Sequence, residues 1–479
     1  MRITFLIPPV LDGGHPAERT SGCTRVVYAT PNIYELTVVA CLEKEGYEDI
    51  EYKDFVYASQ TKKDLTEFLK SDRSQVYCMW SVNLSIENDI AVSRLIHSFS
   101  PQAYVIMMGP GPTFFVEKCL VHDYNIIVRG EPEITTCELM NALRDGNDWH
   151  DIDGISFRKD GKVINNKFRG MIKNLDELPF PARHFIKDKE YHNPKLKLTP
   201  YTVALTSRNC PYKCIYCVPS SLTFAREIEY RKYYHKKPFI SFRSEESIER
   251  ELKELHEQGY KAIGFVDDNF IWNEKRTVAI CRSLKKYGFK WGCQARVDAI
   301  TENIARALGD SGCLYVDLGV ESFDDEILKF IKKGITSEQI YEAIHLLKKY
   351  RVPVKLNILI GTSPLETKKT LKDTLRKAKA LKVDQVMFNI VSPFPGTEFY
   401  RMAKDNGWIT TGDYVPTDVQ RNSILSYPHL TDKEMEKILY WNNISYFLSP
   451  HFIFTQIKRF SNFKEFLYAL KVLKVKLFS

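Results

Sequence analysis

The stretch "TSRNCPYKCIYC", residues 206–217, places three cysteines at spacings of four and three and has no fourth cysteine nearby. Structural zinc sites usually need four ligands, and a redox dithiol would need only Cys214 and Cys217 at the opening of a helix. An iron–sulfur cluster held by three thiolates instead leaves one iron open to a substrate or cofactor. The spacing therefore predicts an iron–sulfur cluster held by Cys210, Cys214 and Cys217, with a structural metal knuckle as the alternative.

The composition is that of a globular protein, because 44% of the 479 residues are hydrophobic and 27% are charged. The net charge of +8 is modest for this length, so nucleic acid binding is not indicated. The N-terminus "MRITFLIPPV" reads as a first strand and not as a signal peptide, and no apolar run is long enough to span a membrane. We therefore expect a cytoplasmic protein whose 11 cysteines are thiols or metal ligands.

Residues 1–145 alternate between β-rich apolar segments and segments with helical periodicity. This pattern predicts an α/β domain with a doubly wound, Rossmann-like parallel sheet, which binds ligands beyond the carboxyl ends of its strands. The turns at residues 109–113 and 129–133 follow such strand ends. Residues 146–195 contain a hairpin-like segment and several prolines, and we interpret them as a linker with a small hairpin.

A second alternation begins near Tyr201 and contains six strand-like segments with helical segments between them. Six is too few for a closed eight-fold barrel, so residues 196–405 predict a partial (β/α)6 barrel whose functional loops share one rim. The cysteines follow the first of these strands and should lie on that rim. Residues 406–479 are expected to form a C-terminal, mostly helical region.

The pattern "CPYKCIYC", with an aromatic residue before its last cysteine, resembles the signature of the radical SAM superfamily. The resemblance implies a [4Fe-4S] cluster whose open iron binds S-adenosylmethionine (SAM). One electron, from a donor such as flavodoxin or ferredoxin, then cleaves SAM to a 5′-deoxyadenosyl radical. The protein would hold that radical beside its target and exclude water, since the hard chemistry belongs to the cofactor.

Other strand ends carry the same resemblance, in the segments "FVDDNF", "CQARVD", "GVESFDDEIL" and "PFPGTEFY". Gly319 and the "KKG" at residues 332–334 accompany the third of these. "IGTSPLET" departs from the family pattern at Leu365, and Asn209 replaces the commoner glycine before the first cysteine. The implied SAM contacts are Tyr216, Asp267, Asp268, Gln294, Arg296, Glu321 and Ser322. A helix N-cap is the alternative for the two aspartates, and a buried ion pair is the alternative for Arg296.

A doubly wound domain before such a barrel resembles the cobalamin-binding class of the superfamily. The turns "WSVNLS", "GPGPTFF" and "VRGEPE" carry this resemblance, although Pro110, Gly111 and Pro132 depart from the usual residues. The Asp-x-His-x-x-Gly motif that supplies a histidine to cobalt is absent. The implied cobalamin contacts are Ser81, Gly109, Gly111, Thr113, Gly130 and Glu131. A nucleotide-type sheet without cobalamin is the alternative.

The resemblance implies an anaerobic methyltransferase acting on an unactivated carbon, with one SAM methylating cobalamin and a second yielding the radical. A non-methylating oxidation, cyclisation or rearrangement with the same cofactors is the alternative, and a redox sensor without turnover is a remote one. Residues 463–479 place an apolar stripe beside lysines, which resembles an interfacial helix. Such a helix suggests a lipid-like substrate and peripheral membrane contact, whereas a stripe packed on the protein's own core would suit any small-molecule substrate.

Overall fold

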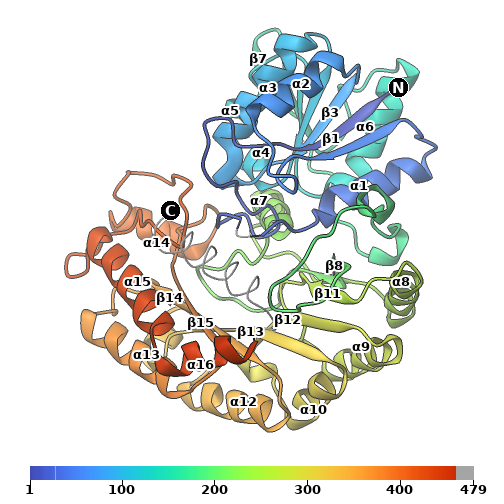
Figure 1. Ribbon diagram of the computed structural model, residues 1–479. Helices are drawn as coiled ribbons and strands as arrows, with labels where there is room; N and C mark the ends of the chain where they lie inside the picture. The colour runs from blue at the N-terminus through green and yellow to red at the C-terminus, as the bar shows by residue number, and fades with distance from the viewer. Residues whose placement is uncertain (27, 460–479) are drawn as a thin grey trace. The chain divides into compact units, whose positions relative to one another are not determined.

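The structure is a computed structural model that describes residues 1–26 and 28–459. The chain divides into two compact units (Figure 1). The first unit comprises Met1–His192, Thr199–Cys210 and Val218–Ser247. The second comprises Asn193–Leu198, Pro211–Cys217 and the described residues from Ile248 onward.

The first unit is built on a mostly parallel sheet with helices on both faces. Its parallel strands are β1 (Ile3–Ile7), β2 (Ile50–Asp54), β3 (Val76–Trp80), β4 (Tyr104–Met108) and β5 (Asn125–Val128). Its helices include α1 (Ile33–Lys44), α2 (Lys62–Ser71), α3 (Ile86–Phe99), α4 (Pro110–Phe114), α5 (Val116–Cys119) and α6 (Pro132–Asp145). Helices α1 and α6 cover one face, and α2 and α3 cover the other (Figure 1). Buried side chains of β3, β4, α2 and α3 form a continuous hydrophobic core between sheet and helices.

The strand order β2-β1-β3-β4-β5 reverses direction between β1 and β3. In doubly wound sheets this reversal marks the place where ligands bind, beyond the carboxyl ends of the strands. The predicted doubly wound fold is therefore confirmed, and the turn after β3 lies at the reversal. The hairpin expected within residues 146–195 is present as β6 (Ile155–Lys159) and β7 (Lys162–Asn165), and it extends this sheet in antiparallel fashion.

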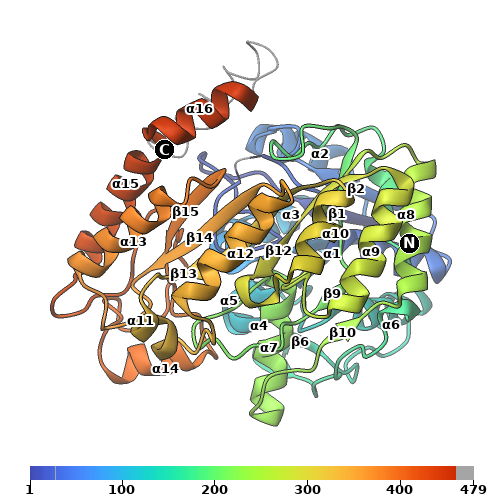
Figure 2. The same ribbon diagram turned by 90° about the horizontal axis from the view of Figure 1, so that it is seen from below.

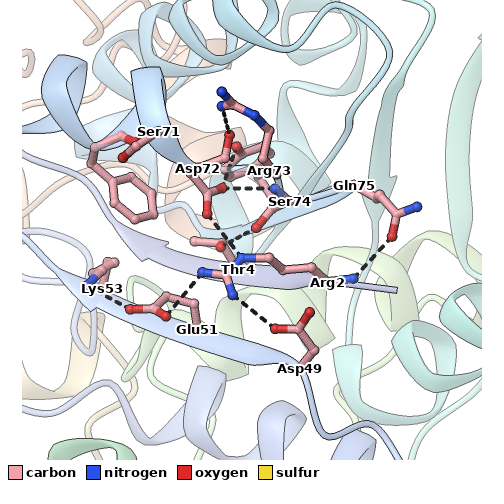
Figure 3. Close-up of polar contacts among 12 residues, drawn as sticks. Arg2, Thr4, Asp49, Glu51, Lys53, Ser71, Asp72, Arg73, Ser74 and Gln75 are labelled. Carbon is pink, nitrogen blue, oxygen red and sulfur yellow. Dashed lines mark hydrogen bonds and ion pairs between the residues drawn. The ribbon is translucent and has the colours of Figure 1, made fainter.

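Ion pairs hold together the amino ends of the first strands, at the opposite edge of the sheet (Figure 3). The Arg2 guanidinium lies 3.0 Å from Asp49, 3.3 Å from Glu51 and 3.2 Å from Asp72. Asp72 also accepts a hydrogen bond of 2.7 Å from the Tyr77 hydroxyl. This edge therefore has a structural role, which leaves the carboxyl edge as the candidate for ligand binding.

The second unit contains a parallel sheet with the strand order β15-β14-β13-β12-β11. These strands are β11 (Ala262–Phe265), β12 (Lys290–Arg296), β13 (Cys313–Glu321), β14 (Val354–Ile360) and β15 (Gln385–Ile390). Together with β8 (Tyr201–Ala204), all six predicted strands are present. The helices between them lie along one side of the sheet (Figure 2): α9 (Glu274–Tyr287), α10 (Glu302–Asp310), α12 (Ser337–Lys349) and α13 (Lys368–Ala380).

Burial along β14 shows which face of this sheet is packed. Val354, Leu356, Ile358 and Ile360 are buried, while Lys355 and the other alternate residues are only half-buried. Because side chains alternate across a strand, the helices cover one face and the other face carries the half-buried residues. The predicted α/β architecture of this region is confirmed.

In the C-terminal region, residues 406–431 follow α14 (Glu398–Asp405) as turns and isolated bridges, and the helices α15 (Asp432–Phe447) and α16 (Pro450–Arg459) come after them. Helix α15 packs against β15. The apolar stripe expected at residues 463–479 lies outside the described residues. Within the described part of the chain, every helix is too short or too polar to cross a membrane.

Candidate active site

The cysteine loop runs between β9 (Ser207–Arg208) and α7 (Ser221–Tyr234). Cys214 is buried, whereas Cys210 and Cys217 are half-buried. Cys210 belongs to the first unit, and the other two cysteines belong to the second. Among the described residues, no three His, Cys, Asp or Glu side chains are arranged as a metal site.

The backbone of the loop is fixed at its centre. The Ile215 amide donates to the carbonyl of Ile331 at 3.1 Å, and its carbonyl accepts from the amide of Phe399 at 3.0 Å. Ile331 follows α11 (Asp325–Phe330), and Phe399 lies in the first turn of α14. The part of the loop between Cys214 and Cys217 is therefore held by two elements of the second unit.

Arg296, at the end of β12, points its guanidinium at the cysteine loop. Its Nη1 lies 3.7 Å from the Cys214 sulfur, and the guanidinium lies 3.6 Å from the centre of the Tyr212 ring. Its remaining donors reach the Asp298 carboxylate at 2.9 and 3.0 Å and the Lys333 carbonyl at 2.6 Å. The structure therefore shows the ion pair considered as the alternative for Arg296, while contact of Arg296 with SAM stays a prediction.

Glu321, at the end of β13, forms a buried ion pair with Lys333 at 2.6 Å. Burial raises the pKa of the nearby Tyr216 hydroxyl, and the Glu321 carboxylate raises it further. Burial alone would lower the pKa of Lys333, but Glu321 and Cys214 outweigh burial and the pKa is raised. Tyr216 is therefore a neutral hydrogen-bond donor and Lys333 a cation, both beside the Glu321 carboxylate.

Gly319 makes room for this ion pair. A Cβ at this position would lie 2.8 Å from Glu321 Oε1 and 2.9 Å from Lys333 Nζ. Any larger residue would therefore displace one partner. Glu321 itself has a left-handed backbone conformation with a φ of 66°, which residues other than glycine rarely adopt. Strained backbone of this kind is concentrated at functional sites.

The other predicted SAM contacts lie at strand ends of the same unit. Asp267 is fully buried and Asp268 is half-buried, and neither caps the following helix, because Asn273 is the N-cap of α9. The N-cap alternative for the two aspartates is therefore wrong. Ser322 is buried and its hydroxyl accepts from the Asp324 amide at 3.1 Å. Gln294 is exposed on β12, and its contact with SAM stays a prediction.

In the first unit, the turns after β3 and β4 pack against each other at the predicted cobalamin edge. The Gly111 amide donates to the Ser81 carbonyl at 3.1 Å. Gly109 has a φ of 98°, and a Cβ there would lie 2.6 Å from the same carbonyl oxygen. A Cβ on Gly111 would lie 2.9 Å from the Val82 carbonyl. Glycine is thus required at both positions by the close approach of the two turns.

The turn after β5 joins this group. Thr113 Oγ1 donates to the Gly109 carbonyl at 2.7 Å and accepts from the Gly130 amide at 3.3 Å. The Glu131 carboxylate binds Arg208 at 2.6 Å and Arg226 at 3.0 Å. The structure brings the three predicted turns together, and direct contact of their residues with cobalamin stays a prediction.

The side chains present fit both implied cofactors. Cys214 lies beside Arg296 and Lys333, and these cations would offset part of the negative charge of a thiolate-bound iron–sulfur cluster. The Ser81 hydroxyl is fully buried and has no hydrogen-bond partner among the described residues. A buried hydroxyl without a partner is costly, and a polar ligand at this edge would satisfy it.

Sequence reasoning missed the roles of Lys333 and Tyr212. In the sequence, Lys333 stands out only as part of the "KKG" segment. The 12 residues that separate it from Glu321 give no sign of a direct ion pair between the two. Tyr212 lies between the first two cysteines, where its side chain supports the Arg296 guanidinium. An aromatic residue within the loop was the only available signal.

Comparisons with known proteins agree with this geometry. Residues 205–378 match the Radical SAM superfamily. A protein of Pyrococcus horikoshii named as the uncharacterized methyltransferase PH0819 is 30% identical over 95% of both chains. The anaerobic magnesium-protoporphyrin IX monomethyl ester cyclase of Cereibacter sphaeroides is 23% identical over 85% of this chain and 64% of its own length.

Two solved structures share the fold. TsrM of Kitasatospora setae, a radical SAM methyltransferase solved with cobalamin and a [4Fe-4S] cluster, matches with a TM-score of 0.63 and 17% identity over 85% of this chain and 78% of its own. The cobalamin-dependent SAM radical enzyme OxsB matches with a TM-score of 0.63 and 18% identity over 93% of this chain and 61% of its own. The chain therefore belongs to the radical SAM superfamily, in one family with the Pyrococcus protein, and has the fold of the superfamily's cobalamin-dependent class.

Proposed function

We propose that this chain is a cobalamin-dependent radical SAM methyltransferase that uses a [4Fe-4S] cluster, SAM and cobalamin to methylate an unactivated carbon. The observation that carries the proposal is the buried group around Cys214. There, Arg296 approaches the cysteine sulfur, and Lys333 pairs with Glu321 beside Tyr216. A structural metal knuckle needs no such set of charged groups.

The residues of the cysteine loop and of the nearby strand ends have distinct tasks in this proposal. Cys210, Cys214 and Cys217 hold the cluster, and the two cations offset part of its negative charge. Glu321 and Tyr216 offer an acceptor and a donor to the polar groups of SAM, and Ser322 and Asp267 follow β13 and β11. Burial of this group keeps solvent and bystander molecules away from a reactive intermediate.

The first unit holds the second cofactor. The Ser81 hydroxyl would bind a polar group of cobalamin, while Gly109 and Gly111 keep the two turns close together. When bound, the cluster and SAM supply a 5′-deoxyadenosyl radical, and cobalamin supplies a methyl group. The Pyrococcus relative is named a methyltransferase, which supports methyl transfer over other chemistry. The cyclase relative keeps a non-methylating reaction as the second candidate.

The face of the second sheet that points away from the helices favours a substrate with polar groups. Strand pairing places Gln294, Asp317, Lys355 and Gln385 side by side across this face. Lys355 and Lys195 lie 2.9 and 2.8 Å from the Asp317 carboxylate, so two cations share one anion. A pure hydrocarbon would offer these polar groups no hydrogen bonds beyond those they already form with one another, whereas a polar small molecule would add some.

The cluster is tested by electron paramagnetic resonance on chain reconstituted anaerobically with iron and sulfide and then reduced. We expect a cluster signal that changes on addition of SAM, in the wild type and in Cys281→Ala, where a buried cysteine outside the loop is removed. Cys214→Ala should lose the signal while still binding cobalamin. A wild type without a signal, or a Cys214→Ala variant with an unchanged one, would contradict the proposal.

A further inference from the structure

The residue directly before Cys210 has an unusual backbone. Asn209 has a φ of 74°, in the left-handed region where glycine is the default residue and asparagine is the best-tolerated alternative. This conformation sets the direction in which the chain enters Cys210. The structure therefore explains how an asparagine can occupy this turn. A glycine would adopt the turn without any side-chain support.

The Asn209 side chain has support that a glycine would lack. Its carbonyl oxygen accepts a hydrogen bond from Arg226 Nη1 of α7, and both side chains are buried. The other terminal nitrogen of Arg226 donates to Ser241 Oγ at 3.0 Å. The guanidinium therefore binds two partners in fixed directions, and its planar shape permits few other arrangements.

A carboxylate fixes the guanidinium in turn. Glu131 Oε1 lies 3.0 Å from Arg226 Nε and 2.6 Å from Arg208 Nη1, and Glu131 Oε2 accepts from the Ile172 amide at 2.6 Å. The second terminal nitrogen of Arg208 lies 2.5 Å from Glu133. Two arginines and two glutamates thus balance in charge, and all four are at most 7% exposed. Removing one partner from such a network leaves a buried charge unpaired, which is costly.

We infer that Glu131, Arg226 and Asn209 are positioning residues for the first cluster ligand. Glu131 orients Arg226, Arg226 holds the Asn209 side chain, and Asn209 keeps the left-handed turn that presents the Cys210 sulfur. Glu131 also belongs to the turn after β5, so the predicted cobalamin edge and the residue before Cys210 share one buried network. This inference rests on the proposed cluster, because Cys210 must be one of its ligands.

The test compares the wild type with variants of these residues by the rate at which a chelator removes iron from the reconstituted chain. The electron paramagnetic resonance spectrum of the reduced cluster is recorded for each. Partners that orient metal ligands typically contribute 10- to 100-fold to metal affinity, so we expect Arg226→Met and Asn209→Ala to release iron about tenfold faster than the wild type. Asn209→Gly should stay within about twofold of the wild type, because glycine adopts the left-handed turn freely. The control is Arg129→Met, which removes a different buried pair, with Glu229 at 2.5 Å, in the same unit.

The double variant Asn209→Gly with Arg226→Met separates positioning from general stability. If Arg226 acts through the Asn209 side chain, its replacement should have little effect on iron release once that side chain is absent. Equal effects of Arg226→Met in both backgrounds, or an equal effect of Arg129→Met, would overturn the inference. Unfolding of the cluster-free variants is followed by circular dichroism, and Asn209→Ala keeps the test open if Arg226→Met does not fold. A wild type that holds no cluster would overturn both the inference and the proposed function, whereas unchanged variants beside a loaded wild type would overturn only the inference.

Discussion

At the scale of single residues, Cys214 and Glu321 each lie beside a cation. Arg296 approaches the sulfur at 3.7 Å, and Lys333 pairs with the carboxylate at 2.6 Å. The sequence predicted Arg296 and Glu321 as SAM contacts, because each ends a strand within a segment that resembles the superfamily's pattern. It did not predict that Lys333 pairs with Glu321, because side chains that meet through folding need no fixed spacing. The same holds for Glu131 and Arg208, which lie 77 residues apart.

Neighbouring lysines allow a matched test of the buried ion pair. Lys333→Met leaves the Glu321 carboxylate buried without a cation, and we expect it to weaken SAM binding about tenfold or more, since loss of one partner of a buried pair costs several kcal/mol. Lys332→Met removes a half-exposed lysine that pairs with Glu398 on the surface, and it should leave SAM binding unchanged. Equilibrium binding of SAM to the reconstituted chain measures both. Equal losses in the two variants would contradict the role given to Lys333.

The Ser81 hydroxyl gives a second residue-scale prediction. Because it has no hydrogen-bond partner among the described residues, Ser81→Ala should leave the unfolding temperature of the cofactor-free chain nearly unchanged. If the hydroxyl binds cobalamin, its loss should weaken that affinity by roughly threefold to tenfold, the effect of one neutral hydrogen bond. Spectrophotometric titration with cobalamin measures the affinity. An unchanged affinity would exclude Ser81 from the cobalamin site.

At the scale of elements, the turns that follow strands carry the candidate site. The strand and helix alternation was predictable because apolar periodicity reports which faces are buried. The departures Gly109-Pro110 and Gly111 were visible in the sequence, but their consequence was not. Only the structure shows that a Cβ on Gly109 would lie 2.6 Å from the Ser81 carbonyl. Close approach of two turns depends on tertiary packing, which local sequence does not encode.

Gly109 and Gly46 allow a glycine in a tightly packed turn to be compared with a glycine in open space. Gly46 and Gly109 both have positive φ, but a Cβ on Gly46 meets nothing within 4 Å. We expect Gly46→Ala to lower the free energy of unfolding by about 1 kcal/mol, the usual cost of a left-handed alanine. Gly109→Ala should lower it by about 3 kcal/mol, because the ψ of −174° at Gly109 lies in a region that only glycine adopts readily and overpacking against the turn after β3 adds to that strain. Denaturant unfolding compares the two, and equal losses would contradict the close packing of the turns after β3 and β4.

The buried face of α1 adds a pH-dependent prediction. Burial raises the pKa of Glu35 to about 8, although its carboxylate accepts from the Trp80 amide at 2.7 Å. The unfolded chain loses this proton near pH 4.5, whereas the folded chain keeps it up to about pH 8. Glu35 should therefore make the first unit less stable as the pH rises across this window.

Glu35→Gln removes the titrating group, so its unfolding temperature should fall less between pH 5 and pH 8 than that of the wild type. Glu48→Gln, at an exposed position, is the control and should behave as the wild type does. Thermal unfolding followed by circular dichroism across this pH range measures the slopes. A Glu35→Gln variant with the wild-type slope would show that Glu35 keeps an ordinary pKa in the folded chain.

At the scale of the whole molecule, the sequence predicted both α/β units and their order along the chain. It interpreted residues 146–195 as a linker with a small hairpin, and the structure contains that hairpin as β6 and β7, which extend the first sheet. That the hairpin would join the sheet was not predictable, because short antiparallel strands at a sheet edge carry little periodicity. The units also interleave in sequence, since Thr199–Cys210 and Val218–Ser247 belong to the first unit and Pro211–Cys217 to the second. Such interleaving follows from tertiary contacts and leaves no local signal.

The central claim is that this chain transfers a methyl group by radical chemistry. The most direct measurement incubates the reconstituted, reduced chain with cobalamin and SAM and follows 5′-deoxyadenosine and S-adenosylhomocysteine by mass spectrometry, with Cys214→Ala as the control. The account predicts both products from the wild type, with cobalamin retained, and no 5′-deoxyadenosine from the variant. 5′-Deoxyadenosine without S-adenosylhomocysteine would contradict methyl transfer and favour the non-methylating reaction. Absence of both products from cluster-loaded wild type would contradict the account as a whole.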